Sequence, residues 1–148
     1  MNKSWLTIYR SKSGTALIEF ALILPVFVLL LAGIIEFASV YFVKHNMLNA
    51  ARQAARGMVV DDLPGSGTSI TCVSATAGSA EEEACDQLIG FGQSFSVNAT
   101  EPDPSDPNDT DVSVVITVPA ADASPIDVLG LFGSKVLQVT VTMRTEDA

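Results

Sequence analysis

Glu19 is the residue whose chemistry most needs an explanation, because it is a carboxylate at the start of a long apolar stretch. A charged side chain at the end of an apolar membrane helix is costly unless it is paired. Gly14 lies five positions before it, and Phe20 follows it directly. One interpretation is an acid near a helix N-terminus in the headgroup region, which the helix macrodipole favours by about 0.3–1 kcal/mol. The other is that Glu19 pairs with a cation.

The chain offers little for catalysis, cofactor binding or a metal centre. Its only histidine is His45, which excludes most histidine-based catalytic and zinc sites. Two cysteines, Cys72 and Cys85, are an incomplete metal site by themselves. We therefore predict no catalytic residues, no cofactor and no metal, and we expect the protein not to be an enzyme.

The segment 101–111 is the one candidate for calcium binding, since it holds five acids and three prolines. Its composition is typical of a solvated loop. The EF-hand pattern fails, because the segment has no glycine at loop position six and no glutamate at position twelve. A solvated loop is the favoured interpretation, and calcium binding is the alternative.

The charge of the chain is divided unevenly along its length. The 148 residues have a net charge of −9 and a mean hydropathy of +0.37. Residues 1–57 hold six cations and two acids, a net charge of +4, whereas residues 58–148 hold two cations and fifteen acids, a net charge of −13. This combination indicates an apolar segment joined to an acidic domain. The acidic part argues against nucleic-acid binding, because phosphates require a basic surface.

Residues 20–43 form an apolar run of 24 residues whose only charged residue is Glu36. As a helix, the run is about 36 Å long and can cross a hydrocarbon core of roughly 30 Å. Three cations and no acid lie among the first 18 residues. Because basic flanks stay in the cytoplasm, we predict a single-pass protein with a cytoplasmic N-terminus and an exported C-terminal domain. We expect Glu36 to face a protein neighbour or the membrane interface.

Two simpler interpretations of this segment are open. A secretory signal peptide fits the basic N-terminus, but the apolar run is longer than the usual 7–15 residues. The best small-residue motifs for cleavage, around Ala32 and Ala38, are poor. An unprocessed signal anchor fits the hydropathy equally well, but it gives Glu19 no role.

The helical pattern continues beyond the apolar run. One narrow face carries small residues and a methionine at helical spacing: Ala50, Ala51, Ala54, Ala55 and Met58. The segment 61–65, with its proline and glycine, then ends the run. We predict one helix over 15–60, about 65 Å long, whose alanine face packs in the core of the exported domain.

The remaining residues, 61–148, predict a small antiparallel sheet with one short helix. Four segments have strand character: 69–73, 94–99, 112–118 and 137–143. Residues 81–89 predict a short helix with acids in its first turn. An apolar cluster at 126–132 either packs on the long helix or contacts the bilayer or another subunit. The predicted fold class is α+β, with a long N-terminal transmembrane helix that continues into a small exported domain with an antiparallel β-sheet.

Cys72 and Cys85 are the only cysteines, and both fall in the part of the chain predicted to be exported. Cysteines outside the cytoplasm form disulfides. A bond between them would close a loop of 12 intervening residues and contribute about 3 kcal/mol in the chain-entropy model. We therefore predict this disulfide.

The surroundings of Glu19 resemble the processing site of type IV prepilins and pseudopilins. A basic leader, Gly14, four residues, Glu19 and an aromatic residue stand in this order before an apolar helix. In that family a membrane protease, the prepilin peptidase, cuts after the glycine. The resemblance implies cleavage between Gly14 and Thr15, which leaves an ammonium group on Thr15. Glu19 would then pair with this amine, in its own chain or in an adjacent subunit, and set the register of assembly.

A longer part of the chain is similar to the TadE-like proteins, pseudopilins or minor pilins of the tight-adherence (Flp) pilus system. The similar segments near the N-terminus are GTALIEFALILP at 14–25, LLLAGIIEF at 29–37 and NAARQAAR at 49–56. Near the C-terminus they are PIDVLGLFG at 125–133 and VTVTMRTE at 139–146. Phe20 stands where the subfamily often has tyrosine.

The resemblance implies a cleavable leader at 1–14, a long helix at 15–60 that spans the membrane at about 20–43, and an exported domain at 61–148. The implied partners are the prepilin peptidase, other pilin or pseudopilin subunits, the inner-membrane pilus assembly machinery and the lipid bilayer. The implied location is the bacterial inner membrane, with the domain in the periplasm and an association with the pilus. A second function stays open, that of an uncleaved, membrane-anchored periplasmic binding module.

Overall fold

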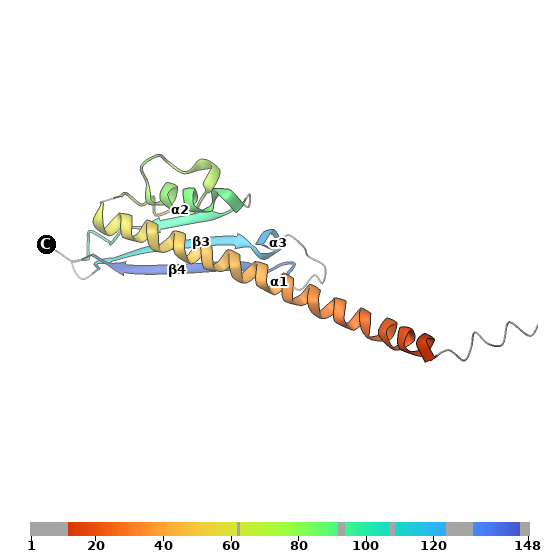
Figure 1. The fold of residues 1–148 in the computed structure, drawn as a ribbon. Helices are drawn as coiled ribbons and strands as arrows, with labels where there is room; N and C mark the ends of the chain where they lie inside the picture. Colours follow the sequence, from red (N-terminus) through yellow and green to blue (C-terminus); the bar gives the residue numbers. More distant parts are fainter. Residues whose placement is uncertain (1–11, 62, 92–93, 107–108, 124–131, 146–148) are drawn as a thin grey trace, which may run out of the picture.

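The computed structural model describes residues 12–61, 63–91, 94–106, 109–123 and 132–145. Most of the predicted leader and most of the predicted apolar cluster at 126–132 therefore lie outside the described residues. Figure 1 shows a molecule of two parts, in which one long helix projects from a small domain built of a sheet and further helices.

Helix α1 runs from Lys12 to Val60 without interruption, and its 49 residues span about 73 Å. The predicted helix 15–60 lies within it. Pro25 is inside the helix. The end of α1 is marked by the Gly57 carbonyl, which accepts hydrogen bonds from the N–H groups of Asp61, at 2.9 Å, and Leu63, at 3.3 Å.

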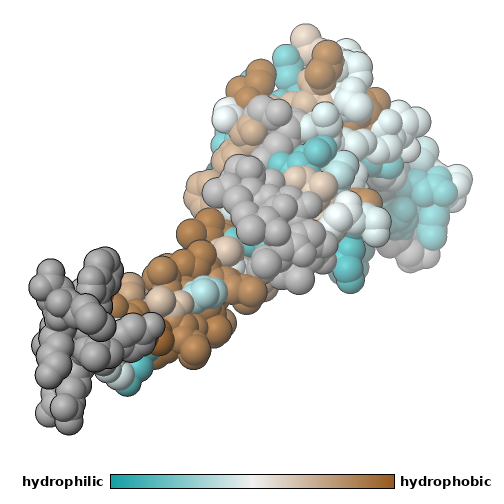
Figure 2. Space-filling view, turned by 90° about the vertical axis from the view of Figure 1, so that its right-hand side faces the viewer, coloured by the Kyte–Doolittle hydropathy of each residue, from teal (hydrophilic) through white to brown (hydrophobic). Residues whose placement is uncertain are grey.

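The N-terminal half of α1 is uncovered. Its large apolar side chains between Leu17 and Ile35 are exposed, and Figure 2 shows a hydrophobic column leading away from the domain. The helix is long and apolar enough to cross a membrane, and none of its most apolar window is buried. A contiguous apolar surface of this extent marks a membrane or protein contact. The structure thus fits a membrane-anchored protein.

The C-terminal domain contains a four-stranded antiparallel sheet in the order β1-β2-β3-β4. Its strands are β1 (Ile70–Thr71), β2 (Ser96–Thr100), β3 (Asp111–Pro119) and β4 (Val136–Arg144). The long helix followed by an antiparallel sheet confirms the predicted α+β class. Each of the four predicted strand segments overlaps a strand, although β1 is shorter than expected because the chain turns into a 3-10 helix at Cys72.

The shorter helices lie around this sheet. They are η3 (Cys72–Ser74), α2 (Ala80–Leu88), η4 (Ile89–Phe91) and α3 (Ala120–Ala123). The hydroxyl of Ser79 caps α2 by accepting a hydrogen bond from the N–H of Glu82 at 3.2 Å. The predicted disulfide is present between Cys72 and Cys85, with Cα atoms 5.2 Å apart, and it ties η3 to α2.

The core lies between one face of the sheet and the helices α1 and α2. Alternate residues of β3, such as Val114 and Ile116, are completely buried, as strand alternation predicts. The helix side of the core is the predicted alanine face, and Ala50 and Ala54 have no exposed surface. Small side chains let α1 approach the strands closely, so this face is core packing, as predicted.

Two glycines near the C-terminal end of α1, Gly57 within the helix and Gly65 after it, lie where the core is closely packed. A Cβ atom on Gly65 would lie 2.5 Å from the carbonyl oxygen of Ala99, whereas one on Gly57 would lie 2.6 Å from Cδ1 of Leu63. The first obstacle is backbone, and the second is the end of a flexible side chain. We expect Gly65→Ala to lower the free energy of unfolding by about 1–3 kcal/mol. Gly57→Ala should be near neutral, because alanine favours the helix.

Denaturant unfolding of the detergent-solubilised full chain, followed by circular dichroism, measures both variants. Equal losses of stability in the two variants would contradict the close backbone approach at Gly65.

Candidate functional site

The predicted processing residues all lie in the first turns of α1. Gly14 is in the helix, and a Cβ atom built on it would meet no atom within 4 Å. Thr15 and Glu19 are exposed. They are four residues apart, so Glu19 lies one turn above Thr15, with a rise of about 6 Å, on the same face of the helix. The geometry puts the carboxylate within reach of an amine at the start of this helix.

Glu19 has apolar neighbours along the helix and no partner from the domain. The side chains of Leu17, Ile18 and Phe20 are 63–70% exposed. Among the described residues, none forms a hydrogen bond or an ion pair with the carboxylate of Glu19. In an apolar environment a charge of either sign attracts an opposite charge far more strongly than in water. In such surroundings an unpaired carboxylate would attract a cation supplied by another group.

A second carboxylate of α1 has a different environment. Glu36 is 1% exposed, and neither of its carboxylate oxygens has a hydrogen-bond partner among the residues that the structure describes. Val40 and Val43, one and two turns later, are also buried. Glu36 was expected to face a protein neighbour or the interface, and this expectation was wrong. The apolar run at 20–43 predicts that α1 is uncovered up to Val43. The folded chain instead covers α1 already at Glu36, so Glu36 is buried within its own chain.

The second buried carboxylate is Glu81, whose Oε1 atom is hydrogen-bonded, whereas its buried Oε2 atom has no hydrogen-bond partner among the described residues. Its Oε1 accepts hydrogen bonds from the Ser66 N–H at 2.7 Å, the Ser66 hydroxyl at 2.6 Å and the Ala99 N–H at 3.4 Å. Burial raises the pKa of Glu81, but the hydrogen bonds that the carboxylate accepts, first of all from Ser66, together outweigh burial, and the net effect is a lowered pKa. Glu81 joins α2 to β2 and to the loop before β1. The sequence indicated only an acid in a first helical turn.

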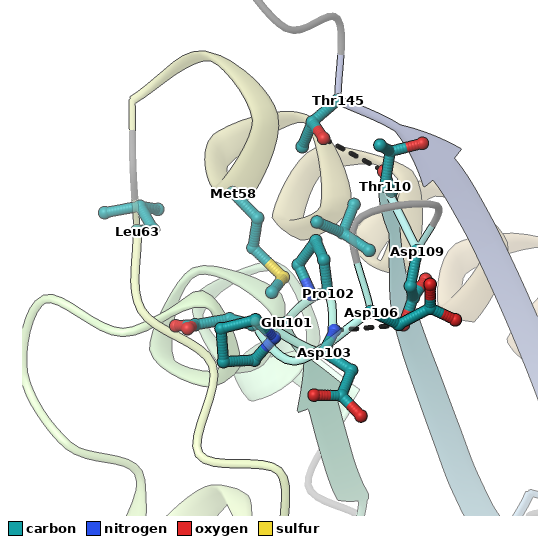
Figure 3. A pocket seen from close by; sticks show the side chains of 11 residues that line it. Met58, Leu63, Glu101, Pro102, Asp103, Asp106, Asp109, Thr110 and Thr145 are labelled. Carbon is teal, nitrogen blue, oxygen red and sulfur yellow. Dashed lines mark hydrogen bonds between the residues drawn. The ribbon is translucent and has the colours of Figure 1, made fainter.

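The acidic segment 101–111 forms part of the wall of an open hollow at the end of α1 (Figure 3). Two of its carboxylates bind groups outside the segment, since Glu101 accepts a hydrogen bond from the Gly65 N–H at 2.8 Å and Asp111 pairs with Arg144 at 3.4 Å. Oδ1 of Asp103 binds its own loop, because it accepts hydrogen bonds from the hydroxyl and the N–H of Ser105, which lower the pKa of Asp103. Asp109 accepts a hydrogen bond from the N–H of Asp103 at 2.9 Å. Among the described residues, no group of three or more acidic, histidine or cysteine side chains could hold a metal ion. The calcium alternative thus finds no support in this part of the chain.

Comparison with known protein families gives a match, and the matched residues lie within α1. Residues 14–56 match the family described as TadE-like protein. This is the family that the sequence resembles, and the matched segment begins at Gly14 and ends in the buried half of α1. The match suggests a protein associated with a tight-adherence pilus. No curated protein and no solved structure matches the chain.

The paired carboxylate of Glu81 predicts how stability depends on pH. Because its folded-state pKa lies below its ordinary value of 4.5, the stabilisation is complete above pH 4.5 and is lost as the pH falls through the folded-state pKa. Glu81→Gln should cost about 1.5–3 kcal/mol at neutral pH, the range for hydrogen bonds to a charged group.

Urea unfolding of the wild type and Glu81→Gln across this pH range measures the difference, which should shrink on acidification. A difference that stayed constant with pH would show that the charge of Glu81 contributes nothing.

The unpaired carboxylate of Glu36 predicts the opposite effect of substitution. A buried polar group without a hydrogen bond costs about 1–3 kcal/mol, so Glu36→Leu should raise the midpoint of thermal unfolding. Glu19→Leu is the matched control, because that carboxylate lies outside the domain and its replacement should leave the midpoint unchanged. A lower midpoint for Glu36→Leu would mean that the carboxylate is stabilised in the folded state.

Proposed function

We propose that this protein is a pseudopilin or minor pilin that takes part in assembling a tight-adherence (Flp) pilus after cleavage by a prepilin peptidase. The observation that carries the proposal is the exposed, unpartnered carboxylate of Glu19, one turn after Thr15 on an uncovered apolar helix. The family match over residues 14–56 supports it, because the matched segment begins at the glycine of the proposed cut.

Cleavage would supply the missing cation. Hydrolysis of the Gly14–Thr15 peptide bond consumes one water, leaves a carboxylate on Gly14 and frees an α-amine on Thr15. This amine is protonated near neutral pH, since its ordinary pKa is about 7.7–8.0. The carboxylate of Glu19 lies about 6 Å further along the helix. An ammonium group of the same chain or of an adjacent subunit then pairs with Glu19, and pairing between subunits fixes their axial register.

The orientation in the membrane is part of the proposal. The leader contains only basic charged residues up to Lys12, which favours a cytoplasmic N-terminus. The domain then lies in the periplasm, and the protein is held in the inner membrane of a bacterium. The disulfide between Cys72 and Cys85 supports this placement, because such bonds persist in oxidising compartments.

The proposed partners follow from the chemistry of the helix. The prepilin peptidase cuts the leader, and lipid surrounds the uncovered half of α1 until other pilin or pseudopilin subunits replace it. The inner-membrane assembly machinery then acts on the processed protein. The chain contributes a substrate site and an assembly contact to these steps, and no catalytic group.

The intact mass of the membrane-extracted protein tests the proposal. We expect a mass that lacks residues 1–14 in cells that contain the peptidase. Gly14→Val should abolish processing, because it puts a branched side chain directly before the cut, where the peptidase would meet only glycine in the wild type. Ala16→Val is the matched control, since it adds similar bulk two residues beyond the cut and should still be processed. A wild-type mass that includes the leader would favour the uncleaved binding module instead.

A further inference from the structure

The exposed face of α1 within the domain carries an arginine pair that has no partner. Arg52 and Arg56 are exposed and one turn apart. Among the described residues, the only ion pair joins Arg144 to Asp111, so both helix arginines are unpaired. The neighbouring carboxylate of Glu83 accepts a hydrogen bond from the amide of Gln53 instead, at 3.1 Å. Because these two arginines have no ion-pair partner among the described residues, they can bind an acidic group of another molecule.

These arginines line a hollow at the free edge of the sheet. It has a volume of about 380 Å³, and its lining residues are Asn49, Arg52, Gln53, Arg56 and Met143. Met143 belongs to β4, which is the last strand in the sheet order and, among the described residues, pairs with β3 alone. The hollow is thus a basic surface between α1 and an unpaired strand edge, open to a second molecule.

An acidic surface lies on the same domain, slightly further along α1. Glu101, Asp103 and Asp106 are exposed on a loop that lines one hollow with Met58 near the end of α1 (Figure 3). The hydrogen bonds of Asp103 and Asp109 within the loop hold its backbone in place. The chain therefore presents a fixed acidic loop and an unpaired basic hollow that are not in contact with each other.

The positions of these two surfaces imply a direction of stacking. Met58 lies two residues beyond Arg56 and six beyond Arg52, which is a rise of about 3–9 Å along the helix. Consider a second copy parallel to the first. A shift of the second copy by about 3–9 Å toward the C-terminal end of α1 brings its arginines level with the acidic loop of the first copy. The pairing of its Thr15 amine with Glu19 of the first copy requires a step of about 6 Å in the same direction.

We propose that the acidic loop 101–106 of one copy binds the basic hollow around Arg52 and Arg56 of a second, parallel copy. This inference rests on the proposed function, since it places the loop contact and the Glu19 contact in one assembly step. The two surfaces are different, so the contact is heterologous and repeats into an open helical array. Opposite charges steer the copies together and fix their register.

Cysteine cross-linking in membranes of cells that contain the peptidase tests the contact without removing any charge. Two differently tagged full-length copies are co-expressed, one with Gln53→Cys in the hollow and one with Pro104→Cys in the loop. The two native cysteines are bonded to each other. We expect a disulfide-linked heterodimer from this pair. The matched control replaces Gln53→Cys by Gln138→Cys, an exposed position on β4, and should give little dimer.

A charge reversal tests whether the arginines cause the contact. Arg52→Glu added to the Gln53→Cys copy should abolish most of the cross-linking. Lys135→Glu makes the same change of charge at an exposed position before the start of β4, and it should leave the yield unchanged. Equal yields from the Gln53 and Gln138 pairs, or a yield that Arg52→Glu does not reduce, would overturn the proposal.

The intact mass of the same samples separates this inference from the proposed function. Processed protein without the specific cross-link overturns the contact and leaves the pilin role standing. Unprocessed protein with the specific cross-link supports the contact and overturns the pilin role. Unprocessed protein without it overturns both.

Discussion

The packing of the alanine face of α1 on the sheet is the contact on which the rest of the structure depends. Ala50, Ala51, Ala54 and Ala55 have no exposed surface, and their small size brings the helix close to β3 and β4. Because α1 is a single uninterrupted helix, fixing its C-terminal half on the domain also fixes the direction of its N-terminal half. That uncovered half presents its apolar side chains to other molecules, and Glu19 has no partner among the described residues.

Three glutamates show how position decides the energetic role of one side-chain type. Glu81 is buried but accepts hydrogen bonds on Oε1, so its charge holds α2 against the neighbouring loop and strand. Glu36 is buried without a hydrogen bond among the described residues, so we expect its carboxylate to oppose the packing of the domain on α1. Glu19 is exposed on an apolar helix, where its charge is costly in lipid until a cation approaches. Only this last carboxylate is available to another molecule.

The uneven charge distribution matters for association. A domain with fifteen acids repels its own copies at long range, and screening by physiological salt reduces this repulsion beyond about 8 Å. Close approach therefore requires a basic surface, and the unpaired arginines at 52 and 56 are the basic surface that the folded domain leaves open. A contact of this kind and a contact through Glu19 would act at opposite ends of one rigid helix, so each reinforces the register that the other selects.

Local spacing in the sequence determined much of this protein: the helix over 15–60, its alanine face, the alternation in β3 and β4, and the isolation of Glu19 in an apolar run. These features depend only on residues close together in the chain, whose periodicity reports which side is buried. Charge and compartment also predicted the bond between Cys72 and Cys85. Only the tertiary structure decided that Glu36 is buried, that Glu81 meets Ser66, and that the helix arginines form no ion pair with any described residue. Those outcomes depend on which distant segments come together when the sheet docks on α1, and no local pattern encodes that choice.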